Sequence, residues 1–145
     1  MVEIREFRYE DAERVSEIVL DSLNEFYPRS LYLEKSRQWP EGFIVGVEGG
    51  VIIAMLMGSL EGRSESRILI FAVQNPYRSR GIGTQMMDEF VKRSAMKGVR
   101  RITLEVRKSN LSAIGFYEKF SFHIEGVLHM YYSDLEDGYR MVKTL

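Results

Sequence analysis

A short basic segment with two glycines, Arg78 to Thr84, separates an apolar run from an amphipathic one. The apolar run, Ile68 to Val73, has the composition of a buried strand, and Met86 to Met96 carries apolar residues at helical spacing. A strand, a tight glycine turn and a helix together bind phosphate, because glycine admits a close ligand and the first helical N–H groups point at the anion. The segment therefore predicts an α/β fold with a phosphate-binding loop.

Two common phosphate motifs do not fit this segment. A P-loop has Lys and then Ser or Thr after its last glycine, whereas Gly83 is followed by Thr84 and Gln85. A dinucleotide fingerprint has a small residue three positions after its second glycine, and Met86 stands there. What remains is Arg-x-x-Gly-x-Gly, which starts at Arg78. The alternative explanation is a plain glycine turn with two solvated arginines.

A second block lies downstream, from Leu104 to Phe122, and includes Leu-Glu-Val-Arg, then Asn110, Ala113 and the pair Phe116-Tyr117. The two blocks together resemble the cofactor site of the GNAT family of N-acetyltransferases, in that family's order and at its usual separation. The resemblance covers almost the whole chain. It implies one acetyltransferase domain over residues 1–145, an α/β (α+β) fold with a mixed, mostly antiparallel sheet, and acetyl-CoA as co-substrate. That sheet would have about seven strands flanked by about four helices.

Periodicity along the chain predicts the element order strand, two helices, three strands, helix, strand, helix, two strands. Proline at 28 and 40 should end the first two helices. The expected strands are 2–7, 43–47, 51–57, 68–73, 102–106, 122–132 and 139–142, and the expected helices are 11–23, 31–39, 86–96 and 110–119. This order resembles the acetyltransferase fold.

The resemblance also assigns the cofactor site. It implies that the pyrophosphate lies on the loop, and that the pantetheine arm pairs with the backbone of the central strand. There the N–H near Val73 would polarise the thioester carbonyl, while the side chains are core. By its own chemistry Asn110 is a helix N-cap, and in the family the matching Asn also contacts the CoA arm. The cofactor-binding residues expected are Phe71, Ala72, Val73, Arg78, Ser79, Arg80, Gly81, Ile82, Gly83, Thr84, Asn110 and Tyr117.

Tyr117 and Glu105 are the candidate catalytic residues. A phenol with a pKa of about 10 can protonate a departing thiolate whose pKa is about 8.5, and Tyr117 matches the family's tyrosine. Its alternative role is aromatic packing beside Phe116. Strand geometry places Glu105 on the face opposite its apolar neighbours, where it would bind the amine or relay its proton through water. The alternative is a structural salt bridge to a nearby arginine.

The expected substrate is an α-amine. At pH 7 an α-amine with a pKa near 8 costs about 1.4 kcal/mol to deprotonate, whereas a lysine amine with a pKa near 10.4 costs about 4.6 kcal/mol. A single carboxylate is better matched to the smaller cost, although lysine is not excluded.

The segment Tyr131 to Tyr139 resembles the Tyr-Tyr-x-Asp-x-Glu-Asp-x-Tyr stretch of N-α-acetyltransferases and is similar to bacterial enzymes that acetylate ribosomal-protein N-termini. In that branch the paired tyrosines grip the peptide, which implies substrate contacts for Tyr131 and Tyr132. The loop after the first helix, with Phe26 and Tyr27, would form the other wall of the groove that binds the peptide. The alternative for all four is ordinary aromatic packing. Arg67 departs from the family's usual uncharged or His residue and leaves the fine specificity open.

Charge and cysteine content narrow the function classes. The net charge is −1, so no overall basic field favours nucleic acid or an anionic membrane. The chain has no cysteine, which excludes disulfides and thiolate nucleophiles. Residues 1–7 are charged rather than signal-like, and the longest apolar run, 51–57, is far below the ~20 residues that span a bilayer. We expect a cytoplasmic protein.

No metal site is expected. The two histidines, His123 and His129, are six residues apart and have no cysteine to join them. Asp134, Glu136 and Asp137 lack the spacing of a calcium loop and are expected to form a solvated turn.

Three functions are compatible with these patterns. The first is a protein N-α-acetyltransferase that uses acetyl-CoA, with protein or peptide N-termini as substrate and with an auxiliary subunit or ribosome association as an option. The second is an acetyltransferase for lysine or a small amine. The third is a CoA-binding regulatory module without turnover. The sequence does not determine the oligomeric state.

Overall fold

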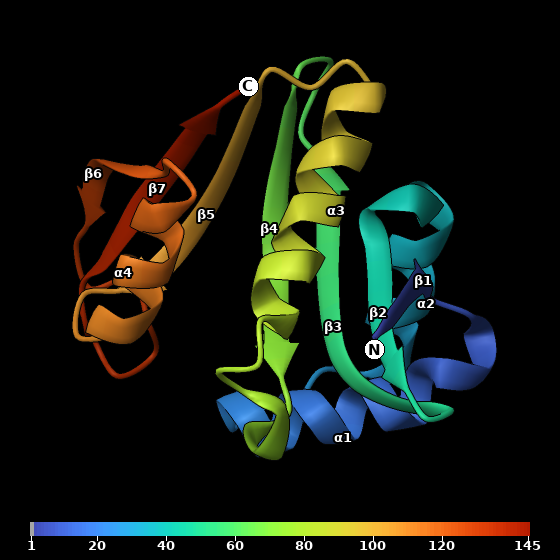
Figure 1. Cartoon of the computed structure of the whole chain (residues 1–145). Helices are drawn as coiled ribbons and strands as arrows, with labels where there is room; N and C mark the ends of the chain where they lie inside the picture. Colours follow the sequence, from blue (N-terminus) through green and yellow to red (C-terminus); the bar gives the residue numbers. More distant parts are fainter. Residues whose placement is uncertain (1) are drawn as a thin grey trace.

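The computed structural model describes residues 2–145, so Met1, which belongs to the charged N-terminal stretch 1–7, lies outside it. Seven strands form one sheet in the order β1-β2-β3-β4-β5-β7-β6 (Figure 1). The strands are β1 Glu3–Glu6, β2 Phe43–Glu48, β3 Val51–Leu60, β4 Glu65–Val73, β5 Arg101–Arg107, β6 His123–Leu128 and β7 Gly138–Thr144. The helices are α1 Ala12–Leu23, α2 Arg29–Gln38, α3 Ile82–Met96 and α4 Leu111–Lys119. The predicted element order and fold class are confirmed.

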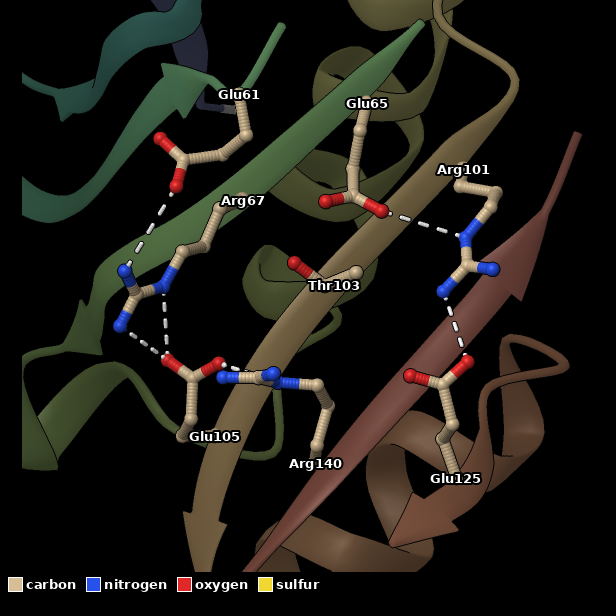
Figure 2. Close-up of a pocket in the computed structure, with 8 residues that line it drawn as sticks. All are labelled: Glu61, Glu65, Arg67, Arg101, Thr103, Glu105, Glu125 and Arg140. Carbon is tan, nitrogen blue, oxygen red and sulfur yellow. Dashed lines mark hydrogen bonds and ion pairs between the residues drawn. The ribbon is translucent and has the colours of Figure 1, made fainter.

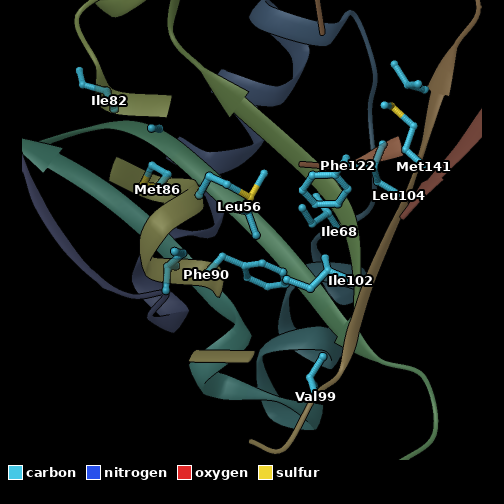
Figure 3. Packing of buried hydrophobic residues seen from close by; sticks show 14 of the residues in the cluster. Leu56, Ile68, Ile82, Met86, Phe90, Val99, Ile102, Leu104, Phe122 and Met141 are labelled. Carbon is cyan, nitrogen blue, oxygen red and sulfur yellow. The ribbon is translucent and has the colours of Figure 1, made fainter. Parts of the chain in front are cut away.

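The helices cover the two faces of the sheet, with α1 and α2 on one side and α3 and α4 on the other. The larger apolar cluster lies between the sheet and α3 and α4, and includes Phe90, Ile114 and Met141. Figure 3 shows this packing around Phe90 and Leu104. A second cluster joins α1 and α2 to β2, β3 and β4, and includes Ile18 and Tyr32. Burial of these apolar side chains from water is the main stabilising contribution.

Within residues 2–145, β4 and β5 are the only parallel pair of strands, and they separate after a short contact. Three consecutive residue pairs, from Glu65 opposite Arg101 to Arg67 opposite Thr103, join them. Beyond this point no residue of β4 is paired with β5, and the two strands diverge in Figure 1. The sheet is therefore open between the ends of β4 and β5, which is where the predicted cofactor residues lie.

Several element boundaries differ from the sequence prediction, and the two largest differences are at α3 and β6. Helix α3 begins at Ile82 rather than Met86, because Gly81 adopts a left-handed φ of 79° and starts the helix at once. Strand β6 ends at Leu128 rather than at residue 132, because Met130 has a φ of 48° that extended backbone does not allow. The paired tyrosines therefore lie on a loop and not on a strand. Within residues 2–145, no helix is long and apolar enough to cross a membrane.

Candidate active site

The predicted phosphate loop connects β4 to α3 and presents free backbone donors. Ser79 and Gly81 both have left-handed φ angles, 64° and 79°. The first backbone hydrogen bond of α3 runs from the Gln85 N–H to the Gly81 carbonyl at 3.1 Å. The N–H groups of residues 82–84 therefore have no partner within the helix, and they point out of its positive end. This geometry fits a pyrophosphate.

Both loop arginines are held close to the phosphate loop. Arg78 Nε donates a hydrogen bond to the Val73 carbonyl at 2.9 Å. The Arg80 guanidinium lies over the ring of Tyr77, 5.3 Å from its centroid, and 3.4 Å from Glu48. Both side chains lie on the exposed surface of the loop, so they add positive charge where the helix N–H groups are free.

Gly83 allows α3 to approach the aromatic residues at the opening of the sheet. A Cβ atom at Gly83 would lie 3.4 Å from Phe116 Cε1 and 3.9 Å from Phe71 Cζ. The rings of Phe71 and Phe116 themselves pack edge to face, with centroids 5.9 Å apart. The first turn of α3, the end of β4 and helix α4 therefore meet at one point.

The last three residues of β4, Phe71 to Val73, have one open backbone edge. They pair with β3 on one side and with no residue of β5 on the other. Their side chains pack in the two apolar clusters, as predicted. An open strand edge can pair with the amides of an extended ligand, so this segment fits the pantetheine arm.

Helix α4 carries Asn110 at its start and Tyr117 near its end. Asn110 Oδ1 accepts a hydrogen bond from the Ala113 N–H at 3.2 Å, which confirms the capping role. The half-buried ring of Tyr117 packs against Phe116 and Phe122, with centroid distances of 5.5 and 5.6 Å. Its hydroxyl makes no hydrogen bond to residues 2–145.

Burial raises the pKa of Tyr117 above its ordinary value of 10.0, and the nearby phenol of Tyr132 raises it further. The Tyr117 hydroxyl therefore stays protonated at neutral and mildly alkaline pH. A general acid must hold its proton until the leaving group takes it, so this ionisation state fits the predicted role.

Glu105 lies between two arginines, as Figure 2 shows. Its Oε1 accepts a hydrogen bond from Arg67 Nε at 2.8 Å and lies 2.6 Å from Arg67 Nη2 in the same ion pair. Its Oε2 accepts from Arg140 Nε at 3.2 Å. The Glu105 side chain is only 8% exposed, and it lies on the face opposite Leu104 and the larger core, as predicted. The salt-bridge alternative is therefore present in the structure.

The ion pairs do not use the whole acceptor capacity of Glu105. A carboxylate has about four acceptor positions, and one hydrogen bond to Oε1 and one to Oε2 occupy two of them. One position on Oε2 remains for a water molecule. Glu105 also lines a charged cavity of about 250 Å³ that it shares with Thr103. This arrangement fits a proton relay through water better than direct contact between Glu105 and an amine.

A separate charged cluster lies at the far end of the same cavity, where β4 and β5 are paired. Arg101 contacts Glu65 at 3.3 Å and Glu125 at 2.8 Å (Figure 2). Its side chain is 44% exposed, so this end of the cavity is open to solvent.

The paired tyrosines lie beside Glu105 on the β6–β7 loop. The rings of Tyr131 and Tyr132 are perpendicular, with centroids 5.1 Å apart, and the Tyr131 hydroxyl lies 3.5 Å from Arg67 Nη2. Burial raises the pKa of Tyr132 to about 12, with a smaller contribution from Tyr131. Glu105 contributes to the same shift, so Tyr132 lies close to both candidate catalytic residues.

The α1–α2 loop carries Phe26 and Tyr27, the residues expected to form the other wall of the substrate groove. Burial raises the pKa of Tyr27, as does the hydrogen bond that its hydroxyl donates to Glu25, and Tyr132 adds to the shift. The α1–α2 loop and the tyrosine loop therefore act on one another electrostatically. Phe26 is 74% exposed and lines, with Leu20, a shallow cavity of about 330 Å³ along α1.

The acidic turn after the tyrosines is not simply solvated, which corrects the sequence expectation. Arg107 Nη1 donates to Asp134 at 2.9 Å and to Glu136 at 2.8 Å. The Glu136 N–H and Arg107 hold the pKa of Asp134 below its usual value, and Ser109 and Arg107 do the same for Glu136. Within residues 2–145, no group of three or more His, Cys, Asp or Glu side chains is placed to hold a metal ion.

Three site residues were not predicted. Glu25 directly precedes Phe26, and the end of the helical pattern at this point was the signal that could have identified it. In the structure, α1 ends at Asn24, which has a left-handed conformation. Arg140 lies opposite Glu105 in the β5–β7 pairing, and only a known strand register reveals such a cross-strand pair. Arg107 stands in the predicted second block, but its partners are far along the chain.

Comparisons with known proteins agree with this geometry. The model of the "Acetyltransferase (GNAT) family" matches residues 12–122. An "N-alpha-acetyltransferase" of Sulfurisphaera tokodaii is 33% identical over 98% of this chain and 92% of its own length. The "N-terminal acetyltransferase B complex catalytic subunit NAA20" of Arabidopsis thaliana is 32% identical over 100% of this chain and 86% of its own length. The crystal structure of Ard1 from Thermoplasma volcanium has a TM-score of 0.95 and 39% identity, covering 99% of this chain and 97% of that one.

The matched segment contains the phosphate loop, the open edge of β4 and both candidate catalytic residues. The similar relatives extend the match to nearly the whole chain. With sequence, geometry and comparisons in agreement, this chain belongs to the acetyltransferase (GNAT) family.

Proposed function

We propose that this enzyme is a protein N-α-acetyltransferase, which transfers acetyl from acetyl-CoA to the free α-amine of a protein N-terminus. The observation that carries the proposal is the pair of perpendicular tyrosines, Tyr131 and Tyr132, which lie beside the ion pair of Arg67 and Glu105. We assign Tyr27, on the α1–α2 loop, to the other wall of the groove, and the Arg101 end of the cavity is open to solvent. An open groove admits a polypeptide chain, and the names of the similar relatives support this substrate class.

The chain's own residues would hold acetyl-CoA along the opening. The N–H groups of residues 82–84, with Arg78 and Arg80, would bind the pyrophosphate. The free edge of Phe71 to Val73 would pair with the pantetheine amides, and Asn110 would contact the same arm. The Val73 N–H would polarise the thioester carbonyl. One domain over residues 1–145 would thus contain the whole cofactor site.

The reaction would be a direct attack of the amine on the thioester carbon, in which a C–N bond forms and the C–S bond breaks. Glu105 would receive the ammonium proton through the water that its free Oε2 position can bind. Tyr117 would give its proton to the departing thiolate. Both groups lie near Tyr132, so they can act on one substrate.

Acetylation of lysine or of a small amine is a second candidate function. A small charged amine requires an enclosed acidic pocket, whereas here Arg67 and Arg140 pair with Glu105 in the cavity. The raised pKa of Tyr117 makes it a stable proton donor, which a regulatory module without turnover does not need. The observations therefore favour an enzyme that acts on N-termini.

We further propose that the enzyme works in the cytoplasm, which the cysteine-free sequence supports, and that it needs no metal, because the proton transfers are assigned to Tyr117 and Glu105. A chelator should then leave the rate unchanged. The similar NAA20 protein is named as the catalytic subunit of a complex, so an auxiliary subunit or ribosome association belongs to the same proposal. Nucleic acid and membrane are not proposed as partners.

The test is mass spectrometry of a mixed peptide set incubated with the protein and acetyl-CoA. Half of the peptides have free N-termini and no lysine, and half have blocked N-termini and contain lysine. We expect acetyl groups only on free N-termini. Acetylation of lysine alone would transfer support to the second function, and acetyl-CoA binding without any product would support the regulatory module.

A further inference from the structure

Arg107, the last residue of β5, contacts the tyrosine loop at three points. Its Nη1 donates to both oxygens of Asp134, at 3.0 and 2.9 Å, and to Glu136 Oε1 at 2.8 Å. Its guanidinium also lies over the ring of Tyr132, with Cζ 4.2 Å from the centroid. One side chain therefore holds the acidic end of the loop and the face of a substrate-wall tyrosine.

The same loop is tied to the cofactor side of the opening. Glu136 Oε2 accepts a hydrogen bond from the Ser109 N–H at 3.0 Å. Ser109 directly precedes Asn110, the cap of the helix that carries Tyr117. Arg107, Asp134 and Glu136, which we call the Arg107 clasp, thus connect the tyrosine loop to the start of α4.

Polar contacts dominate the attachment of this loop. Its apolar side chains Met130 and Leu135 are 64% and 66% exposed, and both residues have left-handed φ angles. The Met130 N–H donates to Asp137 at 2.8 Å within the loop. A segment with so little buried apolar surface opens easily once its polar contacts are lost.

We propose that the Arg107 clasp positions Tyr131 and Tyr132 against the substrate peptide, and that Arg107 is a positioning residue for the acceptor rather than a ligand of acetyl-CoA. The inference rests on the proposed function, because it concerns one wall of the same peptide groove. It also assigns a role to the acidic turn, which is otherwise unused in the reaction.

The clasp requires the shape of an arginine as well as its charge. A guanidinium is planar and can hold two carboxylates at its edge while its face covers an aromatic ring. A lysine ammonium is a point charge and cannot do both. Arg107→Lys should therefore fail to restore what Arg107→Ala loses.

The experiment measures both substrates in Arg107→Ala and Arg107→Lys, with the free-N-terminus peptide that the wild-type enzyme acetylates best. We expect the peptide KM to rise about 10-fold in Arg107→Ala, with kcat and the Kd of acetyl-CoA within about threefold of wild type. Arg107→Lys should stay at least about fivefold above the wild-type KM. Arg93→Ala is the matched control, because Arg93 also pairs with two carboxylates, those of Glu6 and Glu89, and lies in the last turn of α3, outside the proposed groove. It should keep the wild-type peptide KM.

Three results would overturn the proposal: an unchanged peptide KM, a full rescue by lysine, or an equal loss of affinity for both substrates, which would make Arg107 merely structural. If Arg107→Ala does not fold, the double variant Asp134→Asn with Glu136→Gln removes the same contacts and leaves β5 intact. It should show the same selective rise in peptide KM, and a wild-type KM there would overturn the proposal as well.

Hydrogen exchange separates failure of the clasp from failure of the proposed function. In the free protein, Arg107→Ala or the double variant should speed exchange of the Met130 and Tyr132 amides, whichever amine is the true acceptor. Faster exchange in the variants, together with a wild-type enzyme that acetylates no free N-terminus, would refute the proposed function alone. Unchanged exchange would refute the clasp.

Discussion

Replacing Tyr117 with Phe removes one hydroxyl from a ring that Phe116 and Phe122 hold in place. No group of residues 2–145 forms a hydrogen bond with that hydroxyl, so its removal leaves no buried partner unpaired. The free energy of unfolding should therefore change by less than about 1 kcal/mol. The acetyl-CoA Kd should stay within about twofold, because the phenol is assigned to the transition state and not to binding.

The rate should respond far more strongly than the stability. A general acid contributes about 10²- to 10⁴-fold to a rate. Turnover of Tyr117→Phe should thus fall by at least about 100-fold, which corresponds to about 2.7 kcal/mol of lost transition-state stabilisation.

The pH profile of the wild-type enzyme follows from the same residue. Because the pKa of Tyr117 is raised above 10.0, its acid form persists through the alkaline range. The value of kcat/KM should rise as the substrate amine loses its proton near a pH of about 8 and should then remain level to about pH 9.5. A fall in this range would show that Tyr117 loses its proton earlier than its buried position implies.

The assay combines steady-state release of the CoA thiol, calorimetric titration of acetyl-CoA and thermal unfolding. Tyr9→Phe is the control, since Tyr9 is 63% exposed, lies under Arg29 and has no assigned role in the reaction. Unchanged turnover in Tyr117→Phe would refute the acid role. An equal loss of turnover and of acetyl-CoA affinity would instead assign the residue to packing.

Glu105→Gln should lower the free energy of unfolding, measured in urea, by about 1–3 kcal/mol, because two partly exposed arginines lose their counter-ion. The loss of rate in this variant should be largest at low pH, where neutral amine is scarce. A loss of rate that is equal at every pH would contradict the proton relay. Gly58→Ala should lower the free energy of unfolding by about 1–3 kcal/mol, since the added Cβ would lie 2.4 Å from the buried ring of Phe90 in α3. Gly126→Ala is the control and should have the wild-type melting temperature, because its Cβ would have no other atom within 4 Å. The lowered pKa values of Asp134 and Glu136 stabilise the fold at pH values above their ordinary 3.8 and 4.5. That contribution should disappear as the pH falls through the lowered values, so acid titration of the loop amides by hydrogen exchange should show opening only in strong acid.

Local patterns were sufficient for the order of the elements and for the glycine turn at the start of α3. The phosphate loop depends on a glycine turn between a strand and a helix, and every part of that signal lies within a short segment around Arg78 to Thr84. Asn110 could be predicted as a cap for the same reason, because a cap bonds a backbone group three residues away.

The charged side of the site was not predictable in this way. The partners of Glu105 are Arg67 and Arg140, which are 38 and 35 positions away. Their contact depends on the register of β5 with β7 and on the brief pairing of β4 with β5. Before that register is known, the carboxylate of Glu105 is equally compatible with a free base and with a salt bridge.

The amino-acid sequence by itself determined the family, the order of the elements, the phosphate loop and the candidate acid Tyr117, because each is encoded by neighbouring residues. Only the tertiary structure decided that β4 and β5 separate, that two arginines hold Glu105, and that Arg107 holds the acidic turn. These features join residues that are distant in the chain, and their energies arise only once the sheet has brought the charges within hydrogen-bond distance.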